Sequence, residues 1–292
     1  MIANDPGEFF FVFLIFSMRI ALIILFFLAG IAIGSFLNVI VDRLSAGKTI
    51  FSPRLFRYCP NCRREKAFRD LVPVLSYLWL RGRCRYCGNI IPIRSFIVEL
   101  CTGLLSILAY WYYGLSWELG IVIVYCCLFI VLIVTDLEYG ILPNIVIYSG
   151  MIIAIIFAGV TSIFCSEHFF LANQVLNFTE LNIVYAAIGG SVGFVILFII
   201  ALIFRGGMGW GDVKFAGFIG LAVGFPLILL AIFLAVMSGG IMAVILLLLK
   251  RKSRKETIPF GPFLALAAMA ALFWGNDLIY WYLKASAFAV VS

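Results

Sequence analysis

The chain has little charge. Of its 292 residues only 12% are Asp, Glu, Lys or Arg, whereas 65% are hydrophobic. A soluble domain averages about 25% charged and about 45–50% apolar residues. A spanning helix needs roughly 20 apolar residues, and most of the chain divides into runs of that kind. The composition therefore excludes a soluble protein and predicts an all-α polytopic membrane protein with about eight transmembrane helices.

The first residues lack the basic segment of a secretion signal. Asp5 and Glu8 are the only charged side chains before Arg19. The apolar stretch over residues 9–41 is also far longer than the roughly 7–15 apolar residues of a signal. We therefore expect a retained first span here, either as an overlong tilted helix or with its first residues lying at the outer interface.

Histidine is nearly absent, and the basic residues are unevenly placed. Twelve of the 21 Lys and Arg fall in residues 43–94 and five in residues 250–255. Two more, Arg205 and Lys214, border a glycine-rich stretch at residues 206–213. Short loops rich in Lys and Arg stay in the cytoplasm, so these clusters should face inward and both termini outward. The membrane explains this charge better than a nucleic-acid partner does. The single histidine, His168, falls in an outer loop, where we expect a surface residue.

Two CxxC pairs lie in the only long polar segment. They are separated by 21 residues and comprise Cys59, Cys62, Cys84 and Cys87. Four thiolates at this spacing favour a closed tetrahedral zinc site of the ribbon type. Two disulfides or a redox pair are the alternatives, although a cytoplasmic position argues against disulfides. We expect structural zinc and three parts of the chain: residues 1–43 as the first transmembrane helix, 44–94 as the cytoplasmic zinc-binding segment, and 95–292 as the transmembrane core.

Two aspartates fall at predicted helix ends on the cytoplasmic side. Asp212 lies in the glycine-rich stretch, and Asp136 ends a predicted span. An ionisable residue at a membrane boundary is costly, which favours a functional role. Two carboxylates a few ångströms apart share one proton near neutral pH, which provides an acid and a base around one water, as peptide hydrolysis requires. Gly209 and Gly211 would let a substrate strand approach beside Asp212.

Other roles for these aspartates stay open at this point. Asp212 could be the N-cap of a short span over residues 213–223. The helix macrodipole, in contrast, disfavours an anion at the C-terminal end where Asp136 lies. Two membrane acids would also suit an ion-coupled transporter with a zinc-ribbon regulatory loop.

Three further residues have two interpretations each. Glu99 is expected at the first turn of the second span, as a helix-start acid or as a functional group. Lys214 could shape the field of the two aspartates or anchor at the interface. Gly34 forms a GxxxG motif with Gly30, which suits a helix-packing face or a substrate groove.

The ordered set of motifs resembles the bacterial type IV prepilin peptidases, which are GxGD intramembrane aspartyl proteases. The shared features are GSFLN at 34–38, the two CxxC pairs, ELCTG at 99–103, Asp136 through LPN at 142–144, GMGWGDVK at 207–214, and PFGP at 259–262. The resemblance implies an inner-membrane enzyme that cuts the basic leader from type IV prepilins or type II secretion pseudopilins. It also implies that Asp136 and Asp212 are catalytic.

The same resemblance suggests further expectations. Many members N-methylate the new amino terminus with S-adenosylmethionine, although this sequence has no Gly-rich strand–turn–helix fingerprint. Asn144 departs from the family, where an aspartate is common at this position. The expected partners are prepilin or pseudopilin substrates and the lipid bilayer, and no nucleic acid. The residues expected to contact substrate are Gly34, Glu99, Gly209, Gly211 and Lys214.

Overall fold

The structure is a computed structural model that describes residues 6–45, 62, 64–65, 74–164, 182–203, 208–249 and 259–291. Within these ranges the helices are joined by turns and loops, and an isolated antiparallel bridge pairs Arg83 with Ile90. Seven of the described helices are long and apolar enough to cross a membrane. These features confirm the all-α, polytopic class. The chain forms two compact units, Met1–Cys127 (unit 1) and Leu128–Ser292 (unit 2).

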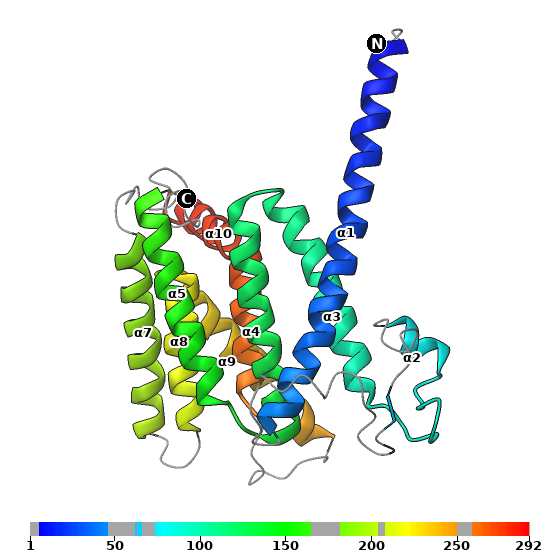
Figure 1. The fold of residues 1–292 in the computed structure, drawn as a ribbon. Helices are drawn as coiled ribbons and strands as arrows, with labels where there is room; N and C mark the ends of the chain where they lie inside the picture. Colours follow the sequence, from blue (N-terminus) through cyan, green and yellow to red (C-terminus); the bar gives the residue numbers. More distant parts are fainter. Residues whose placement is uncertain are drawn as a thin grey trace. The chain divides into compact units, whose positions relative to one another are not determined.

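Unit 1 is built on the antiparallel pair of α1 (Pro6–Ser45) and α3 (Ile93–Tyr113) (Figure 1). α1 is one continuous helix of 40 residues, so at 1.5 Å per residue it is about 60 Å long, roughly twice the hydrocarbon thickness. Of the two predicted forms of the first span, the structure therefore has the overlong helix. A Cβ at Gly30 would lie 2.8 Å from the Thr102 carbonyl oxygen and 2.9 Å from the Gly103 Cα, so the GxxxG motif is a packing face against α3.

A small hydrogen-bonded hairpin precedes α3. It contains the short helix α2 (Leu75–Trp79), the bridge between Arg83 and Ile90, and a turn closed by a hydrogen bond from the Cys84 N–H to the Asn89 carbonyl at 2.8 Å. Gly88 has φ +68° in this turn, a conformation that favours glycine. Figure 1 shows α2 beside the first turns of α3.

Unit 2 contains the C-terminal part of α4 (Trp117–Tyr139) and five further described helices. These are α5 (Asn144–Phe164), α7 (Asn182–Ile203), α8 (Trp210–Val223), α9 (Leu227–Leu248) and α10 (Gly261–Val291). α8 contacts α5, α7, α9 and α10 (Figure 1). It has 14 residues, so it is about 21 Å long and too short to cross a bilayer by itself. The short span predicted over residues 213–223 is thus a buried helix surrounded by longer ones.

Glycines and aromatic rings hold α8 in the centre of unit 2. The backbones of Gly189 and Gly220 touch, so neither position has room for a Cβ without a shift. On another face of α8, the ring of Phe129 from α4 lies 5.9 Å from the Phe215 ring and 5.4 Å from the Phe218 ring, measured between centroids. This packing fixes the C-terminal part of α4 against α8, and each of these helices carries one of the two candidate catalytic aspartates.

Candidate active site

Asp136 is held at the C-terminal end of α4. The helix ends at Tyr139, and Gly140 follows with φ +63° while its N–H donates to the Asp136 carbonyl at 3.0 Å. This is the usual left-handed glycine that closes a helix. The Asp136 side chain is 7% exposed. A charged group near the negative end of the macrodipole gains nothing from the helix, so the helix itself does not explain an acid at this position.

Asp212 lies in the first turn of α8. The N-cap is Gly209, and no side chain caps the helix. The interpretation of Asp212 as the N-cap residue is therefore wrong, because α8 begins at Trp210, two residues before Asp212. The Asp212 N–H donates to the Gly209 carbonyl at 3.1 Å, and the side chain is 9% exposed. The positive end of the macrodipole stabilises a carboxylate here.

Leu142 packs against two glycines that lie beside the aspartates, Gly211 in α8 and Gly261 in α10. A Cβ at Gly211 would lie 3.1 Å from the Leu142 Cβ, and a Cβ at Gly261 would lie 3.2 Å from the Leu142 Cδ2. The Gly261 backbone at the start of α10 also lies against Asp136, since the same Cβ would be 2.5 Å from its Oδ2. The Asp136 and Asp212 carboxylates are close enough to repel each other electrostatically. Three helix ends, those of α4, α8 and α10, therefore converge at this site.

The site leaves a polar atom available. Asp136 Oδ2 is buried beside Gly261, whose backbone N–H favours the charged form of the carboxylate. The Oδ2 has no hydrogen bond of standard geometry to a described residue, so a water or a substrate group can donate a better-aligned one. Gly209 is exposed beside Asp212, whereas Gly211 packs against Leu142. Contacts of these two glycines with a substrate strand stay predictions.

Lys214 is engaged within the protein. Its Nζ donates to the Asn144 Oδ1 at 3.1 Å and lies 5.5 Å from the centroid of the Tyr148 ring. These contacts join α8 to the first turns of α5. Asn144, the residue that departs from the family pattern, is therefore the partner of Lys214. A contact between Lys214 and substrate stays a prediction.

Gly34 and Glu99 lie together in unit 1, at the contact between α1 and α3. A Cβ at Gly34 would be 2.8 Å from the Glu99 Cα. Glu99 is buried, and its Oε2 accepts a hydrogen bond from the Val74 N–H at 2.7 Å. The expectation that Glu99 lies in the first turn is wrong, because α3 begins at Ile93 after Pro92 and has no acid in its first turn. Contacts of Gly34 and Glu99 with substrate stay predictions.

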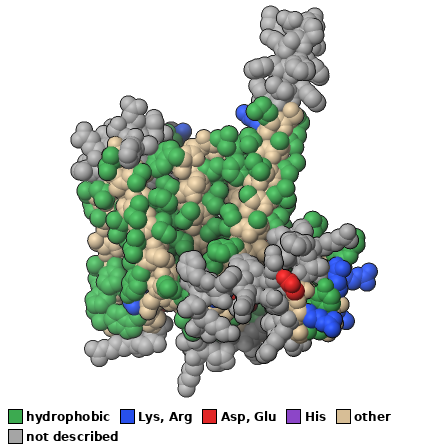
Figure 2. Space-filling view, viewed as in Figure 1, with side chains coloured by type: hydrophobic (Ala, Val, Ile, Leu, Met, Phe, Trp, Pro, Cys, Tyr) green, Lys and Arg blue, Asp and Glu red, His purple; other side chains and the backbone are tan. Residues whose placement is uncertain are grey.

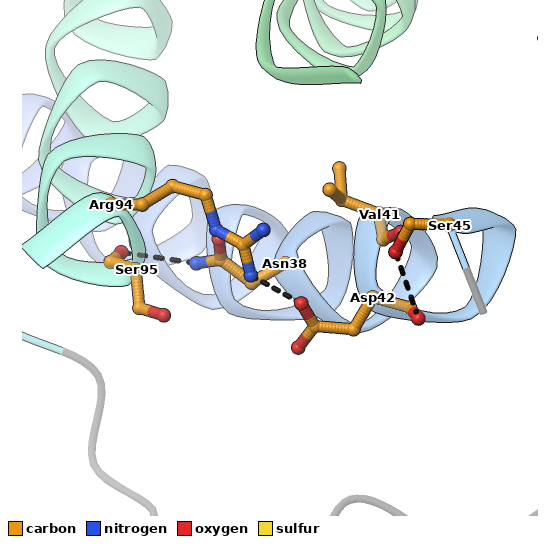
Figure 3. Close-up of polar contacts among 6 residues, drawn as sticks. All are labelled: Asn38, Val41, Asp42, Ser45, Arg94 and Ser95. Atoms are coloured by element: carbon orange, nitrogen blue, oxygen red, sulfur yellow. Dashed lines mark hydrogen bonds and ion pairs between the residues drawn. The ribbon is translucent and has the colours of Figure 1, made fainter. Parts of the chain in front are cut away.

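The cytoplasmic end that the sequence predicts for α1 carries a polar cluster with α3, shown in Figure 3. Arg94 forms an ion pair with Asp42, and the Asn38 side-chain amide donates to the Ser95 carbonyl at 3.0 Å. Arg94 is only 13% exposed in its side chain, while Asp42 is 54% exposed. Sequence reasoning assigned none of these contacts, although they fix the register of the two helices.

Three of the four predicted metal ligands come together. The sulfur atoms of Cys62, Cys84 and Cys87 all lie within 4.8 Å of one another, and Cys59 lies outside the described residues. Thiolates around a tetrahedral zinc, each with a bond of roughly 2.3 Å, stand about 3.8 Å apart. One cluster drawn from both CxxC pairs fits a shared metal better than it fits two separate disulfides. These residues could hold a metal ion.

Together, fold and sites define a multi-pass helical membrane protein with a buried aspartate pair and a cysteine cluster. Residues 28–113 match the model of the bacterial Peptidase A24 N-terminal domain, and residues 123–244 match the model of the type IV leader peptidase family. The chain belongs to the type IV leader peptidase family. No solved structure matches it significantly.

Curated relatives are similar over nearly their whole length, and each is named prepilin leader peptidase/N-methyltransferase. The relative from Bacillus subtilis is 31% identical over 259 residues, which cover 88% of this chain and 96% of the relative. The relative from Pseudomonas aeruginosa is 29% identical, covering 93% of this chain and 97% of its own length. The relative from Aeromonas hydrophila is 30% identical, with 89% and 93% covered.

Proposed function

We propose that this protein is a membrane aspartic endopeptidase that removes the basic leader peptide from type IV prepilins or type II secretion pseudopilins. The observation that carries the proposal is the buried pair of Asp136 and Asp212, brought together at three helix ends in a chain of the type IV leader peptidase family. The names of the relatives supply the substrate class.

The aspartate pair performs the hydrolysis in this proposal. One carboxylate, ionised, takes a proton from a water held between the two groups. The other carboxyl, protonated, donates a hydrogen bond to the scissile carbonyl as the water attacks. The amine then leaves with a proton, and the pair returns to its shared-proton state. Gly209 and Gly211 let the substrate backbone lie beside Asp212.

The cysteine cluster binds zinc in a structural role in this proposal. A fourth ligand from Cys59 would complete a tetrahedral site with no open position, and such sites supply folding energy, not chemistry. The hairpin around Cys84 and Cys87 has α2 as its only described helix, and no residue of α2 is buried. A metal therefore supplies stability that an apolar core does not.

The proposal extends to N-methylation of the new amino terminus, as the names of the relatives indicate. S-adenosylmethionine would supply the methyl group. The described residues contain no strand followed by a Gly-rich turn and a helix, so a nucleotide cradle of that kind does not support this part of the proposal. We also propose that the basic segment and the aspartate pair face the cytoplasm at the inner membrane, because short basic loops remain on that side.

Cleavage of a synthetic prepilin by the purified protein tests the peptidase activity. Asp136→Asn and Asp212→Asn keep the size of the side chain and remove the acid, and each should lower kcat on the order of 10⁴-fold. Asp277→Asn is the matched control, because Asp277 is an exposed acid on α10 outside the site. If either active-site variant cuts at nearly the wild-type rate while folded, the proposed mechanism is wrong.

A further inference from the structure

The hairpin before α3 exposes large apolar side chains. No residue of α2 is buried, and Trp79 is 85% exposed while Leu75 and Leu78 are 64% and 58% exposed. Ile90, farther along the hairpin, is also exposed. Contiguous exposed apolar surface of this kind marks an interaction site in a stable protein.

Two contacts place α2 alongside the spanning part of α3. The Val74 N–H, directly before α2, donates to Glu99, and the Tyr77 ring stacks on Phe96 with centroids 5.3 Å apart. Glu99 lies six residues after Ile93, where α3 begins, so it is about 9 Å farther along the helix axis. α2 therefore starts at the level of the second turn of the span and not beyond its end (Figure 1).

The first turns of α3 also expose apolar side chains. Ile93 and Ile97 are both exposed and lie one turn apart on the same face of the helix. α3 has 21 residues, which is just enough to cross the hydrocarbon core. Its first turns, and with them α2, therefore lie at the boundary between lipid headgroups and acyl chains.

Positive charge follows directly after α2. Arg81 and Arg83 are exposed, and residues 74–92 contain no acidic residue. Figure 2 shows Lys and Arg side chains gathered beside apolar ones at the edge of unit 1. An apolar surface next to arginines matches the interface of a bilayer that carries anionic headgroups. A basic leader peptide would be repelled by the same arginines.

We propose that the hairpin over residues 75–93 is an interfacial anchor for anionic phospholipid. Leu75, Leu78 and Trp79 insert at the boundary between headgroups and acyl chains, and Arg81 and Arg83 bind the phosphates of anionic headgroups. Cys84 and Cys87 belong to the same hairpin, so the anchor holds the cysteine cluster at the membrane surface. The inference does not depend on the proposed peptidase activity.

Photo-crosslinking of the full chain in nanodiscs tests the insertion. Trp79→p-benzoylphenylalanine in discs of phosphatidylglycerol and phosphatidylcholine should give a phospholipid adduct in the intact mass after illumination. The same substitution at Leu104, which is 53% exposed on α3, is the positive control. The proposal fails if Leu104 forms lipid adducts and Trp79 forms none. It also fails if Trp79 crosslinks to protein instead.

The charge requirement is tested by titrating phosphatidylglycerol against the protein in native mass spectrometry. An arginine near an anionic surface contributes roughly a fivefold increase in affinity, so Arg81→Gln with Arg83→Gln should weaken binding at least tenfold. Arg81→Lys with Arg83→Lys keeps the charge and should bind like wild type. Equal binding by the glutamine variant, or equal binding of phosphatidylcholine by wild type, would overturn the assignment to anionic lipid.

Discussion

Replacing Gly261 by alanine tests how tightly the start of α10 positions Asp136. The added Cβ would lie 2.5 Å from the Asp136 Oδ2 and 3.2 Å from its Cγ, whereas ordinary contacts begin at 3.4 Å. The Oδ2 must therefore move by about 0.9 Å. The Leu142 Cδ2 would lie 3.2 Å from the same Cβ, so Leu142 crowds the added methyl group as well. A misplacement of roughly 1 Å in an active site costs about 10²-fold in rate.

We expect Gly261→Ala to lower kcat for prepilin cleavage about 100-fold while the protein stays folded. Gly240→Ala is the matched control, because a Cβ there meets nothing within 4 Å and alanine favours the helix over glycine. Activity should be followed by gel shift of the substrate, and folding by thermal melting in detergent. Wild-type cleavage by folded Gly261→Ala would refute the contact between α10 and the aspartate.

Three further predictions concern unit 1. Glu99→Leu removes the acceptor of the Val74 N–H, at a cost of about 1–3 kcal/mol, so hydrogen exchange in α2 should accelerate. Glu99→Gln keeps an acceptor and should keep the exchange slow. Equal exchange rates in the two variants would argue that this hydrogen bond does not hold α2 against α3. Gly34→Ala pushes α1 away from α3 and should lower the free energy of unfolding by about 1–3 kcal/mol, measured by thermal melting. Gly159→Ala is the control, because a Cβ there meets nothing within 4 Å, and it should melt like the wild type. Cys84→Ser should abolish the binding of about one zinc per chain, measured by elemental analysis; unchanged zinc content would exclude this ligand.

Much of the fold follows from composition and from residues that end helices. Apolar runs predict the spans, and two of the helices that they form, α5 and α7, begin at Asn144 and Asn182. Gly140 and Pro143 interrupt the chain between α4 and α5, because one takes a left-handed φ and the other lacks an N–H. Local rules are sufficient for such boundaries.

The site was predictable only in part. The sequence singled out both aspartates through their cost in a membrane, but Leu142 and Gly261 lie far apart along the chain, and only the packing of α10 brings them together. The tether from Val74 to Glu99 is likewise a tertiary contact. The sequence pattern places Glu99 in the first turn of α3, one turn too early. Pro92 is the signal that gives the correct start, because proline is common at the beginning of a helix and α3 begins directly after it.

The most direct test of a paired mechanism is a double-mutant cycle on Asp136 and Asp212. Cleavage rates would be measured for Asp136→Asn, Asp212→Asn and the double variant, each shown to be folded by thermal melting. If the two acids act as one unit, the double variant should be no slower than the slower single variant, because either change already disables the pair. Independent losses that multiply in the double variant would contradict a shared catalytic site.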